Sequence, residues 1–375
     1  MGLLMLPAAV FAAAGPVKYL DSAGTEATVS DYKSAEEGDW PKDEPWPTLG
    51  GESSGSFWYV LDKDVTYSNC RLTVQGKVNL VLTDGCTLNA KHGIRMAANT
   101  SPGASLTVYG QSTDLKKMGA LIANASDKSS CAGIGGNDQE TGGTIIINGG
   151  RIEATGGKYG AGIGGGEDRN AGNITINGGF VTATGGDFGA GIGGGEGGSG
   201  GDINIADGTV TATGGKKAAG IGGGQKWSGG GNGGTITIGK VKEATSTLEV
   251  TATGTGGGAG IGGGEDGEGG SITINSGTVN ASGGDGEGAG IGGGLDAHAG
   301  TITITGGTVT AFGGQVNDKD FSSQGGAAGI GAGYDNDSGS KSSTAGGHII
   351  INGGKVKGVG GYSKNSSGGD RKSVV

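Results

Sequence analysis

The chain has 375 residues, of which 94 are glycine and 6 are proline, and its 26 basic and 36 acidic side chains give a net charge of −10. Collagen is excluded, because its triple helix needs glycine at every third position together with abundant proline. Nucleic acid and anionic membrane surfaces are disfavoured as partners, since both attract basic patches.

Residues 1–14, MGLLMLPAAVFAAA, form an apolar run that ends in small residues. Ala12 and Ala14 fit the A-x-A pattern that precedes a signal-peptide cleavage site. The run is too short to span a bilayer, so membrane insertion is not expected. We therefore predict an export signal and an extracellular or cell-surface location; the alternative is an apolar cap strand.

Residues 15–55 are polar and irregular, and we interpret them as a leader that caps one end of the fold. Three of the four tryptophans, Trp40, Trp46 and Trp58, fall before residue 60. Covering the open end of a repeat stack is the favoured role, because terminal units need caps. A sugar-stacking platform is the alternative.

Residues 56–130 contain short strands with alternating apolar and polar positions, which predicts short β-helical coils. The coil length is inferred from leucines that recur every 15–18 residues, namely Leu72, Leu88, Leu106 and Leu121. This register would stack Cys70 on Cys86. We slightly favour free thiols there over a disulfide, because a buried free cysteine behaves as a small hydrophobe.

Residues 131–361 contain seven copies of a glycine-rich unit built on the hexapeptide AGIGGG. The copies are spaced by 29, 29, 29, 40, 30 and 39 residues, as counted between Ile134, Ile163, Ile192, Ile221, Ile261, Ile291 and Ile330. A period of this size indicates a stack of similar structural units.

The second copy shows the expected layout of one unit. Two further short strands follow its hexapeptide, in the stretches 172–179 and 180–186. Ile174 and Ile176 share one strand face, as do Val181 and Ala183, because strand side chains alternate with a period of two. Stacked in register, these residues form a continuous core, and paired glycines form the tight corners. We predict an all-β parallel β-helix with about 29 residues per coil in this part.

An asparagine closes the second strand of several copies, at positions 148, 177, 275 and 352. Such a column predicts a hydrogen-bonded side-chain ladder. We expect the ladder to be partial, because Ala206, Gly239 and Thr305 take the same place in other copies.

Insertions break the period at 240–247, 315–326 and 334–345, and a polar tail follows at 362–375. Insertions between repeat strands map to loops, which often lie on the binding face. Trp227 and Tyr334, in the longer loops of copies four and seven, are the isolated candidates for stacking against a sugar.

The five-residue loop after AGIGGG is acidic in most copies, and register predicts that its carboxylates share one corner. Ca²⁺ would relieve their repulsion, and it prefers oxygen ligands. The favoured alternative is a solvated acidic edge without metal. The candidate ligands are Glu167, Asp168, Glu196, Glu265, Asp266 and Asp296.

Outward threonines in the third strands suggest an ice-binding array, but Glu153, Asn280 and Phe312 interrupt the column. A β-helical polysaccharide lyase or hydrolase would need clustered acids and bases. The charged outward pairs, Arg151/Glu153 and Lys355/Lys357, lie at opposite ends of the stack. No catalytic residues are therefore assigned, and an enzyme is disfavoured.

The stretch 56–112 followed by tandem AGIGGG and TITINGGTVTATGG units resembles right-handed β-helix domains of secreted and cell-surface proteins of gut-type bacteria. The resemblance covers about 56–361 and implies a right-handed single-stranded parallel β-helix. It also implies an adhesin-like or polysaccharide-associated module within a larger surface assembly, without a catalytic motif. We therefore expect a non-enzymatic adhesion module or structural stalk, with a polysaccharide or a cell surface as partner. A polysaccharide-active enzyme is the alternative and an ice-binding protein a minor one; no cofactor other than Ca²⁺ is considered.

Overall fold

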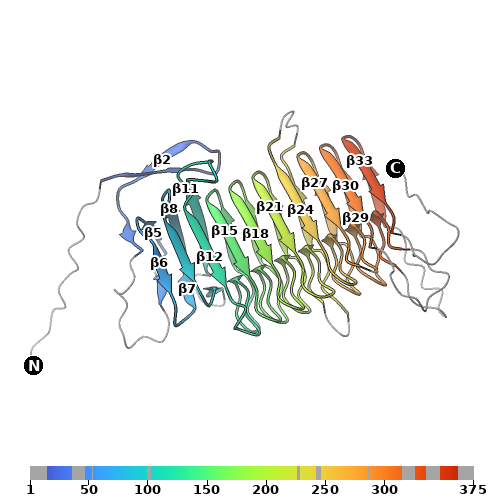
Figure 1. The fold of residues 1–375 in the computed structure, drawn as a ribbon, viewed down its shortest axis with the longest axis horizontal. Helices are drawn as coiled ribbons and strands as arrows, with labels where there is room; N and C mark the ends of the chain where they lie inside the picture. The colour runs from blue at the N-terminus through green and yellow to red at the C-terminus, as the bar shows by residue number, and fades with distance from the viewer. Residues whose placement is uncertain are drawn as a thin grey trace, which may run out of the picture.

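The computed structural model describes residues 15–35, 47–52, 54–98, 103–225, 229–241, 246–285, 287–314, 326–334 and 347–361. All regular secondary structure within these ranges is β-strand. All strands except the first two pair in parallel, in three long sheets. From residue 48 on, the chain visits the three sheets in a fixed order, so three successive strands make one coil, and ten coils stack along the molecule (Figure 1). The predicted parallel β-helix is confirmed.

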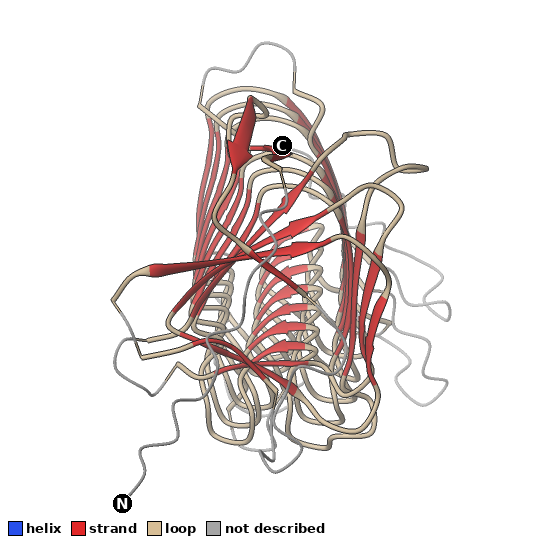
Figure 2. Cartoon of the chain, turned by 90° about the vertical axis from the view of Figure 1, so that its left-hand side faces the viewer, coloured by secondary structure: helices blue, strands red, loops and turns tan. Residues whose placement is uncertain are grey.

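The three sheets form three walls around a narrow interior (Figure 2). The first sheet holds β4 (Thr48–Gly50), β7 (Leu72–Gln75), β10 (Ile94–Met96), β13 (Ile134–Gly135), β16 (Ile163–Gly164), β19 (Ile192–Gly193), β22 (Ile221–Gly222), β25 (Ile261–Gly262), β28 (Ile291–Gly292) and β31 (Ile330–Gly331). The second sheet holds β3 (Lys33–Ser34), β5 (Ser56–Leu61), β8 (Lys77–Leu82), β11 (Ser105–Gly110), β14 (Thr144–Ile147), β17 (Asn173–Ile176), β20 (Asp202–Ile205), β23 (Thr235–Ile238), β26 (Ser271–Ile274), β29 (Thr301–Ile304) and β32 (His348–Ile351). The third sheet holds β6 (Val65–Tyr67), β9 (Thr87–Ala90), β12 (Ala120–Asn124), β15 (Arg151–Thr155), β18 (Phe180–Thr184), β21 (Thr209–Thr213), β24 (Glu249–Thr253), β27 (Thr278–Ser282), β30 (Thr308–Phe312) and β33 (Lys355–Val359).

One continuous apolar core runs through the stack, as the strand alternation predicts. Each hexapeptide isoleucine pairs with its counterpart in the neighbouring coils; Ile221, for example, lies between Ile192 and Ile261 and is fully buried. The isoleucine pairs of the second sheet are buried in the same way from β14 to β29. In the third sheet, Ile152 with Ala154 in β15 and the valine and alanine pairs from β18 to β30 are also buried. Each coil therefore relies on its neighbours for a complete core.

The hexapeptide forms the tightest side of each coil because its glycines let adjacent backbones approach closely. Gly193 has a φ of 147°, and a Cβ placed there would lie 1.9 Å from the carbonyl oxygen of Gly222. Only glycine adopts this backbone conformation at low cost and leaves room for the neighbouring coil.

The coil length predicted for residues 56–130 is wrong. Leu88 and Leu121 are stacked partners, but Leu72 lies in the first sheet and Leu106 in the second. Ser56 pairs with Lys77, Lys77 with Ser105 and Ser105 with Thr144, so the register steps are 21, 28 and 39 residues. Because turn lengths vary in these coils, equal spacing along the chain does not place residues at equal positions in the coil.

The same error affects the cysteines. Cys70 precedes a strand of the first sheet and Cys86 a strand of the third, so the two do not stack. Both are free, as is Cys131.

Part of the leader is more regular than predicted. β1 (Val17–Leu20) and β2 (Glu26–Val29) form an antiparallel hairpin, and β3 and β4 already belong to the solenoid sheets. The hairpin lies beside β11 at the N-terminal end of the stack (Figure 1). Tyr19 packs on Trp58 and Tyr109, with ring centroids 5.3 and 4.7 Å away. Trp58 therefore lies under the hairpin, on the outer face of the second sheet, and does not cover the open end of the stack; Trp40 and Trp46 lie outside the described residues.

The asparagine ladder is present and partial. Asn177 donates from Nδ2 to Oδ1 of Asn148 at 2.8 Å, which joins two coils. Thr305 was expected to interrupt the column, but its hydroxyl donates to Oδ1 of Asn275 at 2.9 Å. A threonine can thus replace asparagine in this corner, because its hydroxyl also reaches the neighbouring coil.

Candidate functional site

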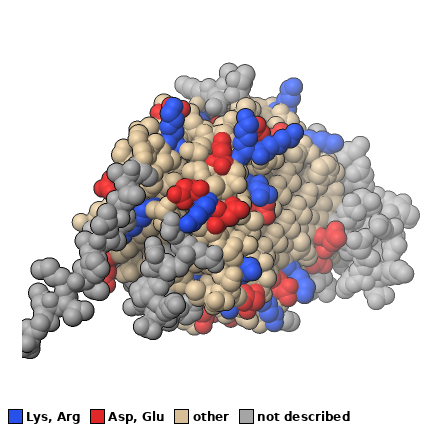
Figure 3. Space-filling view, turned by 60° about the vertical axis from the view of Figure 1, so that its left-hand side comes forward, with Lys and Arg blue, Asp and Glu red and all other residues tan. Residues whose placement is uncertain are grey.

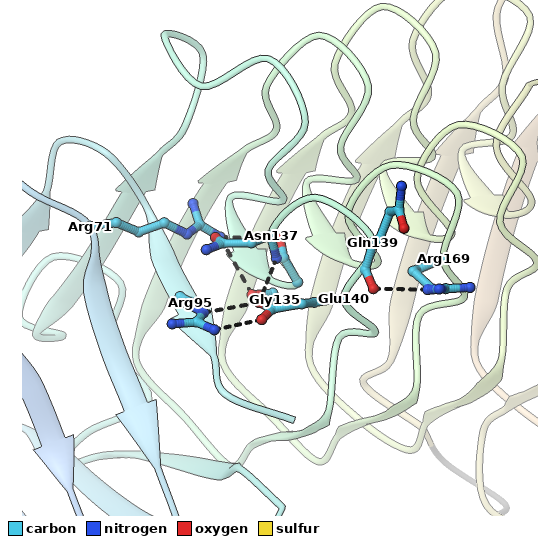
Figure 4. Close-up of polar contacts among 8 residues, drawn as sticks. Arg71, Arg95, Gly135, Asn137, Gln139, Glu140 and Arg169 are labelled. Atoms are coloured by element: carbon cyan, nitrogen blue, oxygen red, sulfur yellow. Dashed lines mark hydrogen bonds and ion pairs between the residues drawn. The ribbon is translucent and has the colours of Figure 1, made fainter. Parts of the chain in front are cut away.

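A buried polar cluster lies where the irregular coils meet the glycine-rich repeat (Figure 4). Arg71 is 2% exposed, and its guanidinium donates to the carbonyl oxygens of His92, Ile94 and Ala132 at 3.0, 2.9 and 2.6 Å. Burial lowers the pKa of Arg71 to about 10, because desolvation disfavours the charged form. One side chain thereby bridges three coils. The sequence held no signal for this role, because Arg71 lies in a stretch without a fixed repeat.

Arg95 and Glu140 extend this cluster toward the surface. Nε and Nη2 of Arg95 donate to the two carboxylate oxygens of Glu140 at 2.9 and 2.5 Å. These hydrogen bonds raise the pKa of Arg95, and the two-point geometry fixes both side chains. His92 is similarly held, with Nδ1 2.7 Å from Asp127 and Nε2 2.8 Å from the carbonyl oxygen of Ser68. The cluster links neighbouring coils, because its side chains hydrogen-bond to backbone carbonyls and to one another across coils.

The predicted acidic corner divides into two adjacent columns. Glu167, Glu196 and Glu265 follow the hexapeptide directly and are partly buried, whereas Asp168, Asp266 and Asp296 are exposed. The three aspartates have φ values of 58°, 61° and 56°, and aspartate tolerates this left-handed conformation better than most residues. Backbone geometry thus explains why aspartate recurs at this position.

Two carboxylates of this corner have side-chain partners. Lys217 lies 2.8 Å from Glu265, and the Ser130 hydroxyl donates to Glu167 at 2.5 Å. Partial desolvation raises the pKa of Asp266, and the neighbouring Glu265 carboxylate raises it further. No group of three or more histidine, cysteine or acidic side chains in the described ranges is placed to hold a metal ion. The calcium site remains a prediction without geometric support.

The two aromatic candidates are not brought together by any described contact. Tyr334 occupies the same column as Glu167, Glu196 and Glu265, and its backbone bonds to Glu287 and Asp296. Trp227 lies outside the described residues. The prediction that either residue stacks on a sugar therefore stays untested.

An open polar groove follows the corner between the first and second sheets over six coils, from β8 to β23. Its volume is about 850 Å³. Two columns line most of it: the residue that begins each second-sheet strand, and the residue that lies three positions earlier. Its polar side chains are Lys77, Ser105, Thr141, Thr144, Asn170, Asn173, Ser199, Asp202 and Thr235. We call this feature the polar groove.

The wall of the polar groove is rigid because its side chains join successive coils. Asn170 Oδ1 accepts from the backbone N–H of Ser199 at 2.8 Å, and Ser199 Oγ accepts from that of Asn232 at 3.3 Å. Parallel pairing fixes the second column, since Asn173 pairs with Asp202 and Asp202 with Thr235. The repeat thus presents hydroxyl and amide groups at each coil, about 4.8 Å apart.

The groove is nearly neutral, with Lys77 and Asp202 as its charged side chains. On the face drawn in Figure 3, large areas carry no charge, and acidic and basic groups lie close together where they occur. The outward pair Arg151/Glu153 forms its own ion pair at 2.8 Å, while Lys357 lies 5.8 Å from the Phe312 ring at the other end. These charged residues do not form a catalytic cluster.

Five stretches match the family model of the β-helix repeat, at residues 145–167, 174–196, 203–225, 272–295 and 302–334. Each match begins in a second-sheet strand and ends just after the next hexapeptide, so it covers about one coil. The unit with β23 and β24, which carries the insertion at 240–247, is not among the matches. Searches of curated proteins and of solved structures found no match. Within the described ranges, no helix has the length and apolar character needed to cross a bilayer.

Proposed function

We propose that the protein is a non-enzymatic module, displayed outside the cell, that binds neutral polysaccharide in the polar groove and so serves in adhesion or carbohydrate association. The groove carries this proposal: it is long, open and lined by regularly repeated hydroxyl and amide groups. Such groups can replace the water that hydrates sugar hydroxyls, and the near absence of charge favours an uncharged polymer. The location outside the cell rests on the predicted signal at 1–14.

The polar groove is rigid in the absence of ligand, which supports the proposal that it binds a polymer without rearranging. One column begins the second-sheet strands and is held in register by the sheet, and the other is joined from coil to coil by side-chain hydrogen bonds. Little side-chain ordering is therefore needed on association. Each coil offers a weak set of contacts, and several coils together raise the affinity for a long chain over that for a short one.

A substitution that blocks the polar groove should weaken polysaccharide binding. In affinity electrophoresis with dextran, galactomannan and xyloglucan, we expect at least one polymer to retard the wild-type chain. Asn173→Arg fills the middle of the groove with a long charged side chain, and we expect affinity for that polymer to fall at least tenfold. Thr211→Arg is the matched control, because Thr211 is an exposed outward strand residue on the third sheet.

Equal retardation of both variants, or no retardation of the wild type by any of the three polymers, would contradict the proposal. Release of soluble fragments from a bound polymer would contradict the non-enzymatic part and favour a polysaccharide-active enzyme. The melting temperatures of both variants should match that of the wild type, so that loss of binding is not loss of fold.

A further inference from the structure

We propose that a second concave site, at the opposite ends of the second-sheet strands, binds a single neutral hexose unit. We call it the corner pocket, and its defining side chains are Asn148, Asn177, Phe180, Asp207 and Lys240. Its volume is about 440 Å³, and it is more enclosed than the polar groove. The inference rests on the proposed carbohydrate-binding function and names a binding site that the polar groove does not include.

The N-terminal hairpin forms one wall of the corner pocket through Leu20 and the turn at 22–24. Two bonds of 2.9 Å from the backbone N–H groups of Ala23 and Thr25 to Asp21 Oδ1 fix this turn. Gln111 Nε2 donates to the carbonyl oxygen of Lys18 at 2.8 Å and ties the hairpin to the third coil. The wall is therefore pre-formed, which lowers the cost of binding a small ligand.

The amides of the ladder supply hydrogen-bonding groups. The bond between Asn177 and Asn148 uses one N–H of Asn177 and the oxygen of Asn148. It leaves the Asn148 amide nitrogen as a donor and the Asn177 oxygen as an acceptor. A donor and an acceptor on neighbouring coils suit two hydroxyls on adjacent carbons of a sugar ring.

Asp207 supplies a fixed and accessible carboxylate. Its Oδ1 accepts from the backbone N–H of Gly208 at 2.8 Å and from the Thr247 hydroxyl at 3.1 Å. Its Oδ2 lies 3.7 Å from Lys240 Nζ, and the Asp207 side chain is 31% exposed. The lysine balances the charge of the carboxylate, so the pocket favours a neutral sugar over a uronate or an amino sugar.

Phe180 adds an apolar surface to these polar groups. Its ring is partly exposed, and Met118 lines the same pocket. A hexose has a face of C–H groups and an edge of hydroxyls, so it can pack on an aromatic ring while its hydroxyls bond to Asn and Asp side chains.

Four side chains of the corner pocket depart from the repeat, whereas Asn148 and Asn177 belong to the asparagine ladder. Phe180 pairs with Arg151 and Thr209 in the adjacent coils, so this copy alone places an aromatic ring there among its neighbours. Asp207 occupies the position of Gly149 and Gly178, and Lys240 and Thr247 come from the insertion of copy four. Residues needed only for the fold would follow the repeat, and these do not.

We expect the chain to bind at least one sugar from a panel of D-glucose, D-galactose, D-mannose and N-acetyl-D-glucosamine, with a dissociation constant in the millimolar range. Saturation-transfer NMR with the purified chain detects such binding. We expect Phe180→Ala and Asp207→Asn each to weaken it at least tenfold, and Asn280→Arg, at an exposed strand residue of the third sheet outside both sites, to leave it unchanged. All three variants should melt at the wild-type temperature, because the three side chains are partly or fully exposed.

Failure of all four sugars to bind, or full binding by the Phe180→Ala/Asp207→Asn double variant, would overturn this inference. The outcome is separable from that of the polar groove. If a polymer binds but no free sugar does, only the corner-pocket proposal is contradicted. If a free sugar binds but no polymer does, only the proposal for the polar groove is contradicted.

Discussion

Ile221→Asp lowers the melting temperature by about 10 °C, because the new carboxylate lies unpaired in the middle of the core. Ile221 is fully buried between Ile192 and Ile261, and its environment in the interior is apolar. A buried, unpaired charge belongs to the small class of substitutions that cost about 4–5 kcal/mol or more. Differential scanning calorimetry of the purified chain measures the effect.

Thr211→Asp is the matched control for this variant. Thr211 is an exposed strand residue in the coil that contains β20 to β22, so the same carboxylate stays in water there. We expect a change within about 0.5 kcal/mol. An unchanged melt for Ile221→Asp would contradict the inward assignment of the hexapeptide isoleucines.

Gly193→Ala destabilises the stack although it adds a single methyl group. The Cβ would lie 1.9 Å from the carbonyl oxygen of Gly222, and alanine disfavours the φ of 147° found there. Because both the strained backbone and the contact with the next coil must relax, we expect a loss of about 3 kcal/mol or more. Thermal and urea denaturation give the loss in the free energy of unfolding.

Gly51→Ala tests whether the effect of Gly193→Ala comes from geometry. The nearest atom to a Cβ at Gly51 is Phe57 Cζ at 3.5 Å, an ordinary van der Waals contact, and its φ is not positive. This variant should change stability by less than about 0.5 kcal/mol. Equal losses at both glycines would show that close packing of the hexapeptide corners is not what demands glycine.

The sequence predicted the fold well where the repeat is regular. From β14 to β30, strand alternation identified the buried residues, because one constraint, stacking on an identical neighbour, acts on every coil. The leucine spacing gave the wrong coil length over residues 56–130, because Leu72, Leu88 and Leu106 occupy three different sheets. There the turns differ in length, and spacing along the chain no longer reports position in the coil.

The candidate sites were harder to predict for a physical reason. Asn170 and Asn173 look like ordinary outward residues in the sequence, and only parallel pairing places them with Ser199 and Asp202 along one groove. The corner pocket needs the N-terminal hairpin, which is more than 100 residues from Phe180 and meets the stack through tertiary packing. The recurring aspartates share a left-handed backbone conformation, as their positive φ values show, and this reason for their recurrence is not visible in the sequence.

Hydrogen exchange with and without a retarding polysaccharide tests the central claim most directly, because it locates the bound polymer on the chain. If the polymer lies in the polar groove, amide exchange should slow in peptides that contain 141–144, 170–173, 199–202 and 232–235. The exchange rates of peptides from the third sheet should stay unchanged. Slower exchange confined to the third sheet, or no change along the groove while polymer is bound, would contradict it.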